Sequence, residues 1–203
     1  MIRGLIALAF LAASPALAQT QPPAATPPAT VKVALDTAEG RIVLEVETGR
    51  APITAGNFLH YVDQHRLDGV NFYRVVKVQD HFGFVQFGVQ NAPKRVLPPI
   101  KHEPTSQTGI KHTDFTVSTG RLEPGTARGD FTIVLGDQPS FDADPSRPGD
   151  NLGYAAFAHV IEGKDVVEKI FNSPLSPTLT DRGAFKGEML EMPVKILKAA
   201  RLP

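Results

Sequence analysis

The N-terminal part of the predicted domain alternates apolar and polar residues, as a β-hairpin does. Residues 31–37 (VKVALDT) and 41–47 (RIVLEVE) carry an aliphatic side chain at almost every second position, and a connection ending in Gly40 joins them. Such alternation is typical of strands with one buried face. The period then changes: residues 51–65 have Pro52 near the start and apolar side chains at helical spacing, which predicts one amphipathic helix.

The rest of the chain reads mostly as short strands. Residues 71–89 (NFYRVVKVQDHFGFVQFGV) predict two apolar strands with a short polar connection, followed by a long polar loop over 91–112. Further elements are predicted in this order: strands at 114–119, 130–135 and 154–161, a short helix at 165–171, and a strand at 192–199. Many short strands with two helices are typical of a closed barrel or a sandwich.

One arginine stands out among the apolar residues of the 71–89 segment. Arg74 has aromatic and β-branched neighbours, and a guanidinium on such a strand must either reach solvent or be paired, because burying a lone charge is costly. Taken by itself, Arg74 reads more simply as an edge-strand charge kept for solubility. The rest of the sequence decides between this interpretation and a functional one.

The first residues resemble an export signal. Arg3 precedes an apolar run over residues 5–13, and Ala16-Leu17-Ala18 forms a small-x-small site before Gln19. This order predicts a secretory signal peptide over 1–18, cleaved after Ala18. Retention as an uncleaved anchor is the weaker alternative, because the run falls short of the roughly 20 residues that span a bilayer.

Composition supports one exported domain after a linker. Residues 19–30 contain only Pro, Ala, Thr and Gln, which predicts a flexible Pro-rich linker, and residues 31–203 suit a single domain. Arg3 is the only charged residue before position 31, so the remainder carries 20 basic and 21 acidic residues. This balance argues against a nucleic-acid partner, and the absence of cysteine excludes disulfides and thiolate chemistry.

Five segments then follow one another in a specific order. They are residues 40–62 (GRIVLEVETGRAPITAGNFLHYV), 72–76 (FYRVV), 85–88 (VQFG), 123–142 (EPGTARGDFTIVLGDQPSFD) and 154–170 (YAAFAHVIEGKDVVEKI). In this order the chain resembles the cyclophilin family of peptidyl-prolyl cis/trans isomerases, over essentially all of 31–197. The resemblance implies a mainly β fold, a closed eight-stranded antiparallel barrel capped by two helices, with the substrate groove on its outer face.

The resemblance also implies roles for individual residues. Arg74 in FYRVV matches the family's catalytic arginine, and Gln86 in VQFG matches the glutamine that hydrogen-bonds the substrate backbone. Phe131 matches an aromatic floor of the proline pocket and Phe141 an apolar wall, while Tyr154 takes the place of the usual rim histidine.

The neighbouring loop supplies the other side of the implied groove. The backbone around Arg121, including Gly120, matches the segment that holds the residue before proline, although the family usually has asparagine in place of this arginine. Asp130 stands where glutamine is usual, and Thr132 where a pocket phenylalanine is usual.

A further departure lies between the arginine and the glutamine. The connection over 77–83 is longer than the family's short turn and puts Gly83 where another pocket phenylalanine is expected, so that Phe82 or Phe84 would have to substitute for it. The chain also lacks tryptophan, which the family uses to bind cyclosporin. These departures predict activity below the family's best and weak drug affinity.

The histidines suggest no metal site. His60 and His65 lie five residues apart on the predicted helix, a spacing that does not place both on one face. His102 stands next to Glu103, and His112 stands close to Asp114, in a polar loop where solvated side chains are expected in preference to a metal or acid–base pair. His159 alternates with apolar residues on a predicted strand and is read as a core histidine.

Two other groupings are also weak. A hydrolase using Ser118 or Ser140 would need a nucleophile-elbow pattern, which is absent. Asp142, Asp144 and Asp150 share one loop, but the spacing of a calcium loop is missing, so a solvated acidic loop is expected.

The chemistry implied by the resemblance is non-covalent. Rotation about an Xaa-Pro bond crosses a barrier of roughly 20 kcal/mol set by amide resonance, and a site that fits the twisted amide needs no nucleophile, metal or cofactor. A guanidinium aimed at the prolyl nitrogen, beside an apolar pocket, meets that need.

The sequence thus predicts a monomeric isomerase that acts on Xaa-Pro bonds of folding or unfolded exported proteins, without a cofactor. Its location would be periplasmic in a two-membrane bacterium and secreted otherwise. The alternative is a cyclophilin-fold peptide-binding module or chaperone with little turnover.

Overall fold

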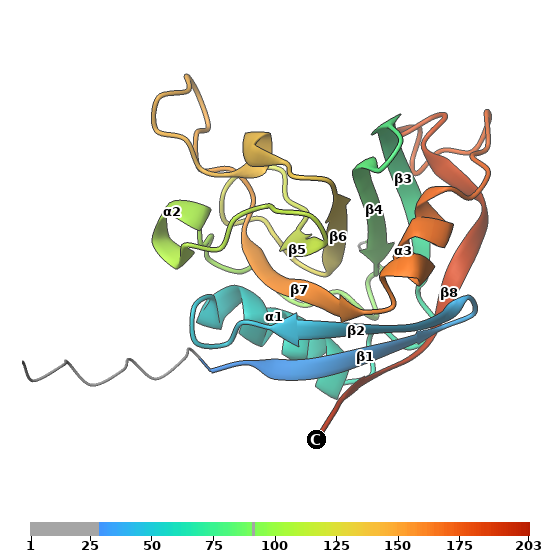
Figure 1. Cartoon of the computed structure of the whole chain (residues 1–203), viewed down its shortest axis with the longest axis horizontal. Helices are drawn as coiled ribbons and strands as arrows, with labels where there is room; N and C mark the ends of the chain where they lie inside the picture. The colour runs from blue at the N-terminus through green and yellow to red at the C-terminus, as the bar shows by residue number, and fades with distance from the viewer. Residues whose placement is uncertain (1–28, 91) are drawn as a thin grey trace, which may run out of the picture.

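Eight antiparallel strands close into one barrel (Figure 1). The computed structural model describes residues 29–90 and 92–203; the predicted signal peptide and most of the linker lie outside them. The strands are β1 (Val31–Thr37), β2 (Gly40–Val46), β3 (Asn71–Gln79), β4 (Phe82–Gly88), β5 (Thr116–Thr119), β6 (Asp130–Leu135), β7 (Ala156–Glu162) and β8 (Met189–Arg201). Their order around the barrel is β1-β2-β7-β5-β6-β4-β3-β8, which confirms the predicted fold class.

The last strand closes the barrel and is longer than predicted. The expected strand covered 192–199, whereas β8 has 13 residues. Its first half pairs with β3, where Val194 faces Phe72, and its second half pairs with β1, where Ala200 faces Ala34. The strand is long because it must pair with two neighbouring strands in turn. Several of its residues are exposed, so apolar and polar residues alternate less regularly along it, and the sequence pattern predicts a shorter strand.

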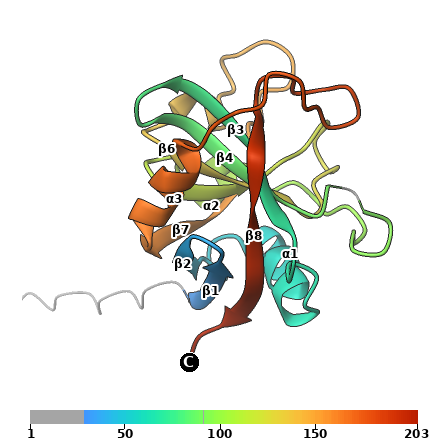
Figure 2. The same cartoon turned by 90° about the vertical axis from the view of Figure 1, so that its right-hand side faces the viewer.

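Three α-helices accompany the barrel in the part of the chain that the structure describes. They are α1 (Pro52–Asp63), α2 (Thr105–Thr108) and α3 (Lys164–Phe171). Figure 2 shows β8 crossing the view between α3 and α1, so the two longer helices cover different parts of the barrel. The short α2 was not predicted and lies within the loop expected over 91–112. Among the described residues, no helix is long and apolar enough to cross a membrane.

Helix α1 begins on a residue that cannot cap it. Ala51 has no side-chain acceptor, so the first N–H groups of the helix need partners from elsewhere. The carboxylate of Glu103 accepts hydrogen bonds from the N–H groups of Ile53 (3.2 Å) and Thr54 (2.6 Å). Glu103 is 1% exposed, so the expectation of a solvated side chain at this position was wrong; it is a buried helix cap.

The barrel interior is filled by alternate residues of each strand. On β6, Phe131 and Ile133 join the core, and their neighbours Asp130 and Thr132 line a cavity on the opposite face. This two-residue period is the normal geometry of a strand. It separates the residues that hold the barrel together from those that form the candidate site.

The β3–β4 connection explains why a glycine stands at position 83. The register of the two strands shifts between Lys77 and Gln79, and Gly83 has a φ of +152°. A Cβ atom there would lie 1.9 Å from the carbonyl oxygen of Val76. No side chain fits at this position, so an aromatic residue must come from elsewhere.

Candidate functional site

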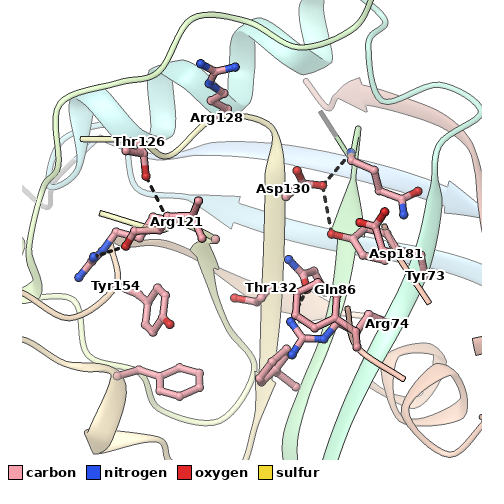
Figure 3. Close-up of a pocket in the computed structure, with 16 residues that line it drawn as sticks. Tyr73, Arg74, Gln86, Arg121, Thr126, Arg128, Asp130, Thr132, Tyr154 and Asp181 are labelled. Atoms are coloured by element: carbon pink, nitrogen blue, oxygen red, sulfur yellow. Dashed lines mark hydrogen bonds between the residues drawn. The ribbon is translucent and has the colours of Figure 1, made fainter. Parts of the chain in front are cut away.

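A cavity of about 670 Å³ lies on the outer face of the barrel beside β3, β4 and β6. Figure 3 shows Arg74, Gln86 and Thr132 together on the strands, with Arg121 and Tyr154 across the cavity. The lining residues come from these strands and four connections between elements: Tyr73, Arg74, Phe84, Gln86, Gln90, Gly120, Arg121, Leu122, Thr126, Arg128, Asp130, Thr132, Phe141, Tyr154, Asp181 and Phe185. Nearly all residues predicted for the site are therefore brought together.

The guanidinium of Arg74 is held in one orientation by two side chains. Its Nε donates to Oε2 of Glu188 (2.7 Å), and its Nη2 lies 2.6 Å from the same oxygen. Its Nη1 donates to Oε1 of Gln86 (3.0 Å). The side chain of Arg74 is 15% exposed. The charge is thus paired, as a partly buried guanidinium on this strand requires.

These contacts leave part of Arg74 free. Each terminal nitrogen of a guanidinium carries two N–H groups, and each makes one contact with the residues that the structure describes, so among these residues Nη1 and Nη2 both keep a donor. The ring of Phe185 lies 3.7 Å from the Cζ atom and the ring of Phe84 lies 5.3 Å from it. Arg74 therefore presents N–H groups in a site where aromatic rings limit access of water.

Three aromatic rings form a row along one wall of the cavity. Phe84 lies 6.0 Å from Phe141 between ring centroids, and Phe141 lies 5.2 Å from Tyr154. The Cζ atom of Arg121 is 5.4 Å from the ring of Tyr154. The row of rings thus begins beside one arginine and ends beside another, and neighbouring rings are inclined by 60° to each other. It provides an apolar surface that suits a pyrrolidine ring.

Gln86 faces the loop across the cavity. Its oxygen accepts from Arg74, which leaves the amide N–H₂ as the end available to a ligand. Within the described part of the chain this nitrogen donates no hydrogen bond, and a Cβ atom at Gly120 would lie 3.3 Å from it. Glycine at position 120 keeps that approach open, so Gln86 can donate to a peptide carbonyl in the cavity.

Arg121 has a structural role as well as its place in the lining. Its Nε and Nη2 donate to the carbonyl oxygen of Gly153 (2.9 and 2.5 Å), and its Nη1 donates to Asp150 (2.5 Å). This pairing holds the pKa of the Asp150 carboxyl below its usual range. The side chain therefore ties its loop to the neighbouring loop, and Asp150 is an ion-pair partner rather than a simply solvated acid.

Asp130 closes the far end of the cavity. Its Oδ1 accepts from the hydroxyl of Tyr73 (3.2 Å; Figure 3) and from the backbone N–H of Gln90 (2.9 Å). Burial raises the pKa of Asp130, and these two hydrogen bonds only partly oppose the shift. Burial likewise raises the pKa of Tyr73. The carboxylate at this position thus exists in an enclosed polar corner.

The prediction for Phe131 was wrong about its location. Its side chain is 0% exposed and packs among Phe58, Tyr61, Phe87 and Phe157 inside the barrel. The strand period explains the error, because adjacent residues point to opposite faces. The residue that faces the cavity is the next one, which is a threonine, so the cavity lacks an aromatic floor there.

The other predicted aromatic positions divide in the same way. Phe84 lines the cavity and Phe82 does not; Phe82 packs beside Gly136 near the β3–β4 turn. Thr132, at the position of a usual phenylalanine, is instead hydrogen-bonded through Oγ1 to Ser118 (2.9 Å). Ser118 is thereby part of a buried hydroxyl pair behind the cavity.

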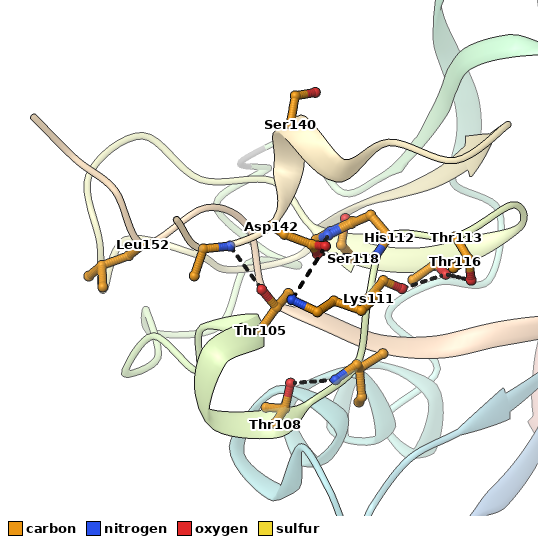
Figure 4. Close-up of polar contacts among 12 residues, drawn as sticks. Thr105, Thr108, Lys111, His112, Thr113, Thr116, Ser118, Ser140, Asp142 and Leu152 are labelled. Carbon is orange, nitrogen blue, oxygen red and sulfur yellow. Dashed lines mark hydrogen bonds and ion pairs between the residues drawn. The ribbon is translucent and has the colours of Figure 1, made fainter. Parts of the chain in front are cut away.

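A buried histidine supports the wall formed by Phe141. The Nδ1 of His112 lies 2.8 Å from Oδ1 of Asp142 (Figure 4). The His112 ring is 5.7 Å from the ring of Phe141. The His112 side chain is fully buried and its Nε2 has no partner among the described residues. Burial lowers the pKa of His112, against the opposing effect of Asp142. The expected solvated histidine was therefore wrong.

The remaining polar groupings do not form a metal centre. Among the described residues no three His, Asp or Glu side chains lie together as ligands. His102 is buried, with Nε2 3.2 Å from the carbonyl oxygen of Leu152. His159 is half-buried and hydrogen-bonds Thr116 (3.1 Å). In the acidic loop, Asp144 pairs with Arg147 (3.1 Å).

Several site residues were missed by reading the sequence. Four of them lie close in the sequence to predicted site residues, and this closeness was the only available signal: Tyr73, Gln90, Thr126 and Arg128. The loop between α3 and β8 gave no signal, because its 17 residues have neither helical nor strand periodicity. It nevertheless supplies Asp181 and Phe185 to the lining and Glu188 to Arg74.

Comparisons with known proteins agree with this geometry. Residues 30–200 match the family described as cyclophilin type peptidyl-prolyl cis-trans isomerase/CLD. The chain is 37% identical over 141 residues to peptidyl-prolyl cis-trans isomerase cyp18 of Streptomyces antibioticus, covering 68% of this chain and 81% of that protein. It is 33% identical over 151 residues to a peptidyl-prolyl cis-trans isomerase of Acinetobacter baylyi, covering 73% and 76%.

The fold comparison points the same way. The crystal structure of a cyclophilin type peptidyl-prolyl cis-trans isomerase of Cryptosporidium parvum superposes with a TM-score of 0.69 at 16% identity, covering 86% of this chain and 99% of that one. At this identity the likeness concerns the fold. Together with the sequence relatives and the barrel that carries Arg74 and Gln86, it shows that this chain belongs to the cyclophilin family of peptidyl-prolyl cis-trans isomerases.

Proposed function

We propose that this isomerase turns Xaa-Pro bonds of folding or unfolded exported proteins, and that Arg74 is its catalytic residue. The observation that carries the proposal is the fixed guanidinium, which keeps free N–H groups beside a row of aromatic rings. When the amide twists, the prolyl nitrogen regains a lone pair, and a positioned donor stabilises that charge more than it stabilises either planar form.

The other groups hold the two sides of the bond. The surface of Phe84, Phe141 and Tyr154 receives the proline ring, and the amide of Gln86 donates to a substrate carbonyl. The backbone of Gly120 and Arg121 borders the position of the preceding residue. Because one side of the bond is held by apolar contact and the other by hydrogen bonds, rotation occurs between two anchored halves.

Replacing Arg74 tests the catalytic role. We expect Arg74→Ala to lower kcat/KM by roughly 100-fold, the effect of removing one preorganised donor, while the affinity for a proline peptide changes little. The rate is measured by NMR exchange on an Ala-Pro peptide and the affinity by fluorescence anisotropy. Arg41→Ala is the control, because Arg41 is an exposed arginine on β2, outside the cavity.

The same experiment separates catalysis from simple binding. If Arg74→Ala keeps the wild-type rate, or if the wild type does not exceed the uncatalysed rate, catalysis by Arg74 is contradicted. If only the peptide affinity responds, the chain is acting as a peptide-binding module, the alternative that Asp130 and Thr132 favour by departing from the usual groove residues.

We also propose that the chain is exported with its first 18 residues removed. The support is the order of Arg3, the apolar run and the Ala16-Leu17-Ala18 site. Expression of the full chain in a two-membrane bacterium should yield a periplasmic protein whose N-terminal sequence starts at Gln19. A protein that keeps Met1 and stays with the membrane fraction would instead support an uncleaved anchor.

A further inference from the structure

The loop before β8 forms one border of the cavity and is well anchored there. Residues 181–188, called the strap below, close on themselves through backbone hydrogen bonds between Asp181 and Ala184 (3.0 and 2.9 Å). Arg182 donates from Nη2 to the carbonyl oxygen of Gln90 (2.9 Å), and Val75 on β3 donates to the carbonyl oxygen of Glu188 (2.8 Å). The strap is therefore tied to β3 and to the segment that follows β4.

Phe185 is the aromatic residue that the strap contributes. Its ring centroid lies 3.7 Å from the Cζ atom of Arg74, a stacked guanidinium contact, yet the residue remains 38% exposed. A stacked guanidinium covers one ring face only, and the ring borders the cavity. An aromatic surface is thus left at the position where a ligand of Arg74 would bind.

The backbone at Phe185 is in an unfavourable conformation. Its φ is +61°, in the left-handed region that bulky residues rarely adopt. A glycine or asparagine would satisfy the same turn with less strain, so the turn does not explain why a phenylalanine stands here. Observed strain of this kind is concentrated at functional sites, where the surrounding structure enforces it.

The charges around Phe185 are balanced, so the exposed ring decides which substrates it suits. The Arg74 charge is paired with Glu188, and the strap carries Arg182 and Lys186 as well as Asp181 and Glu188. A charged substrate side chain thus finds no excess of opposite charge in the strap, whereas an apolar side chain would cover the exposed ring and remove its surface from water. Apolar neighbours of the isomerised bond are therefore favoured.

We propose that Phe185 contacts the substrate and selects apolar side chains next to the Xaa-Pro bond. This inference rests on the proposed function, because it places the bond at Arg74. It differs from the roles of the aromatic row, since Phe185 comes from the loop before β8 and stacks on the arginine itself.

The test uses two peptide sets on the full protein. In each set the residue before or after the Xaa-Pro pair is Leu, Phe, Ala or Glu, and kcat/KM is measured by NMR exchange. We expect Phe185→Ala to lower kcat/KM about tenfold for Leu and Phe peptides of one set, within the range that one apolar contact contributes to specificity. The Ala and Glu peptides should change less than about twofold.

Two further variants act as controls. Phe185→Leu keeps an apolar side chain and should retain most of the preference, which separates lost contact from lost folding. Leu179→Ala changes an exposed apolar residue just before the strap that does not line the cavity, and it should leave the preference at the wild-type value. Thermal unfolding of each variant confirms that the fold persists.

Three results would overturn the proposal. A uniform fall across all peptides would show that Phe185 acts only through Arg74, a uniform rise would show that the strap obstructs the cavity, and an unchanged preference would show no contact. Anisotropy of the labelled peptides gives a second readout. If the wild type binds the peptides but does not accelerate exchange, the proposed function fails. This inference would still be supported if the wild type bound Leu peptides more tightly than Ala peptides and Phe185→Ala removed that difference.

Discussion

At the scale of single residues, Glu188 decides what Arg74 can offer a substrate. One oxygen of its carboxylate contacts both Nε and Nη2, and Gln86 accepts from Nη1. Because Glu188 and Gln86 hold the guanidinium through different nitrogens, it cannot rotate away from the cavity without losing a charge-assisted hydrogen bond. Glu188 is thus a positioning residue for the proposed catalytic step.

Replacing Glu188 by glutamine should weaken catalysis without abolishing it. The neutral amide can still accept a hydrogen bond, so we expect a loss of about 1 kcal/mol, which corresponds to a roughly fivefold lower kcat. KM should stay unchanged, because the peptide does not need Glu188 for binding. NMR line-shape analysis separates kcat from KM, and a rise in kcat would show that the carboxylate weakens the donor instead of positioning it.

The buried histidine His112 makes the stability of the fold sensitive to acid. An unfolded imidazole has a pKa near 6.5, and burial lowers the pKa of His112 in the folded chain. Below about pH 6.5 the unfolded chain therefore binds more protons than the folded one, and the free energy of unfolding falls as the pH falls. Protonation would also place an N–H on Nε2, which lacks a partner among the described residues.

Urea unfolding at pH 7.5 and pH 5.5 measures this dependence. The difference in unfolding free energy between the two pH values should shrink in His112→Gln. His60→Gln removes an exposed histidine of α1 and serves as the control, with the wild-type difference expected. An equal difference in wild type and His112→Gln would show that other groups carry the acid sensitivity.

Sequence patterns located the centre of the site but not its surroundings. Arg74, Gln86 and Tyr154 were assigned by their resemblance to short family motifs, and all three line the cavity. Glu188 and Phe185 were not, because they reach Arg74 from more than 100 residues away along the chain through a loop without periodicity. A contact of that kind depends on the closed barrel and has no local sequence signal.

At the scale of elements, strand β6 shows how one residue of register changes a role. Phe131 was predicted in the pocket and is in the core, whereas Thr132 faces the cavity. The strand itself was predicted with its observed bounds, Asp130–Leu135. The error lay in choosing a face, because both faces of β6 carry buried residues and alternation gives no unique answer.

Truncating Phe131 and Phe84 should separate stability from binding. Phe131→Ala removes a fully buried ring and should cost about 3–5 kcal/mol of unfolding free energy. Phe84→Ala removes a half-buried ring from the cavity wall and should cost about 1 kcal/mol, while raising the KM for proline peptides. Urea unfolding and NMR exchange measure the two effects, and comparable losses of stability in both variants would contradict this separation.

At the scale of the whole molecule, a residue before the predicted domain boundary is hydrogen-bonded to the barrel. The domain was expected from residue 31, but the carbonyl oxygen of Ala29 accepts from the N–H of Gly49 (2.8 Å) and from Oγ1 of Thr48 (2.9 Å). The pattern of side chains along the sequence could not show these hydrogen bonds, because their acceptor is the backbone carbonyl group of Ala29.

Trimming the chain at this boundary tests where the fold starts. A chain that begins at Ala29 should unfold at the same temperature as the full chain. A chain that begins at Val33 loses the Val31↔Val46 strand pair and the hydrogen bond from Leu202 to Lys32. Each lost hydrogen bond should cost about 1 kcal/mol of unfolding free energy, so the midpoint temperature of unfolding should fall by about 4 °C or more. Calorimetry measures both, and equal midpoints would place the start of the fold after residue 32.

The alternation of inward and outward residues on β4 and β6 has a consequence for how this protein can change. Random libraries at Phe84, Asp130 and Thr132 would leave most members folded, because these side chains face the cavity and the core lies on the opposite side of the same strands. Libraries shifted by one residue, to Val85 and Phe131, would mostly contain unfolded chains. New peptide preferences are thus accessible by single substitutions, and the barrel that carries them stays as it is.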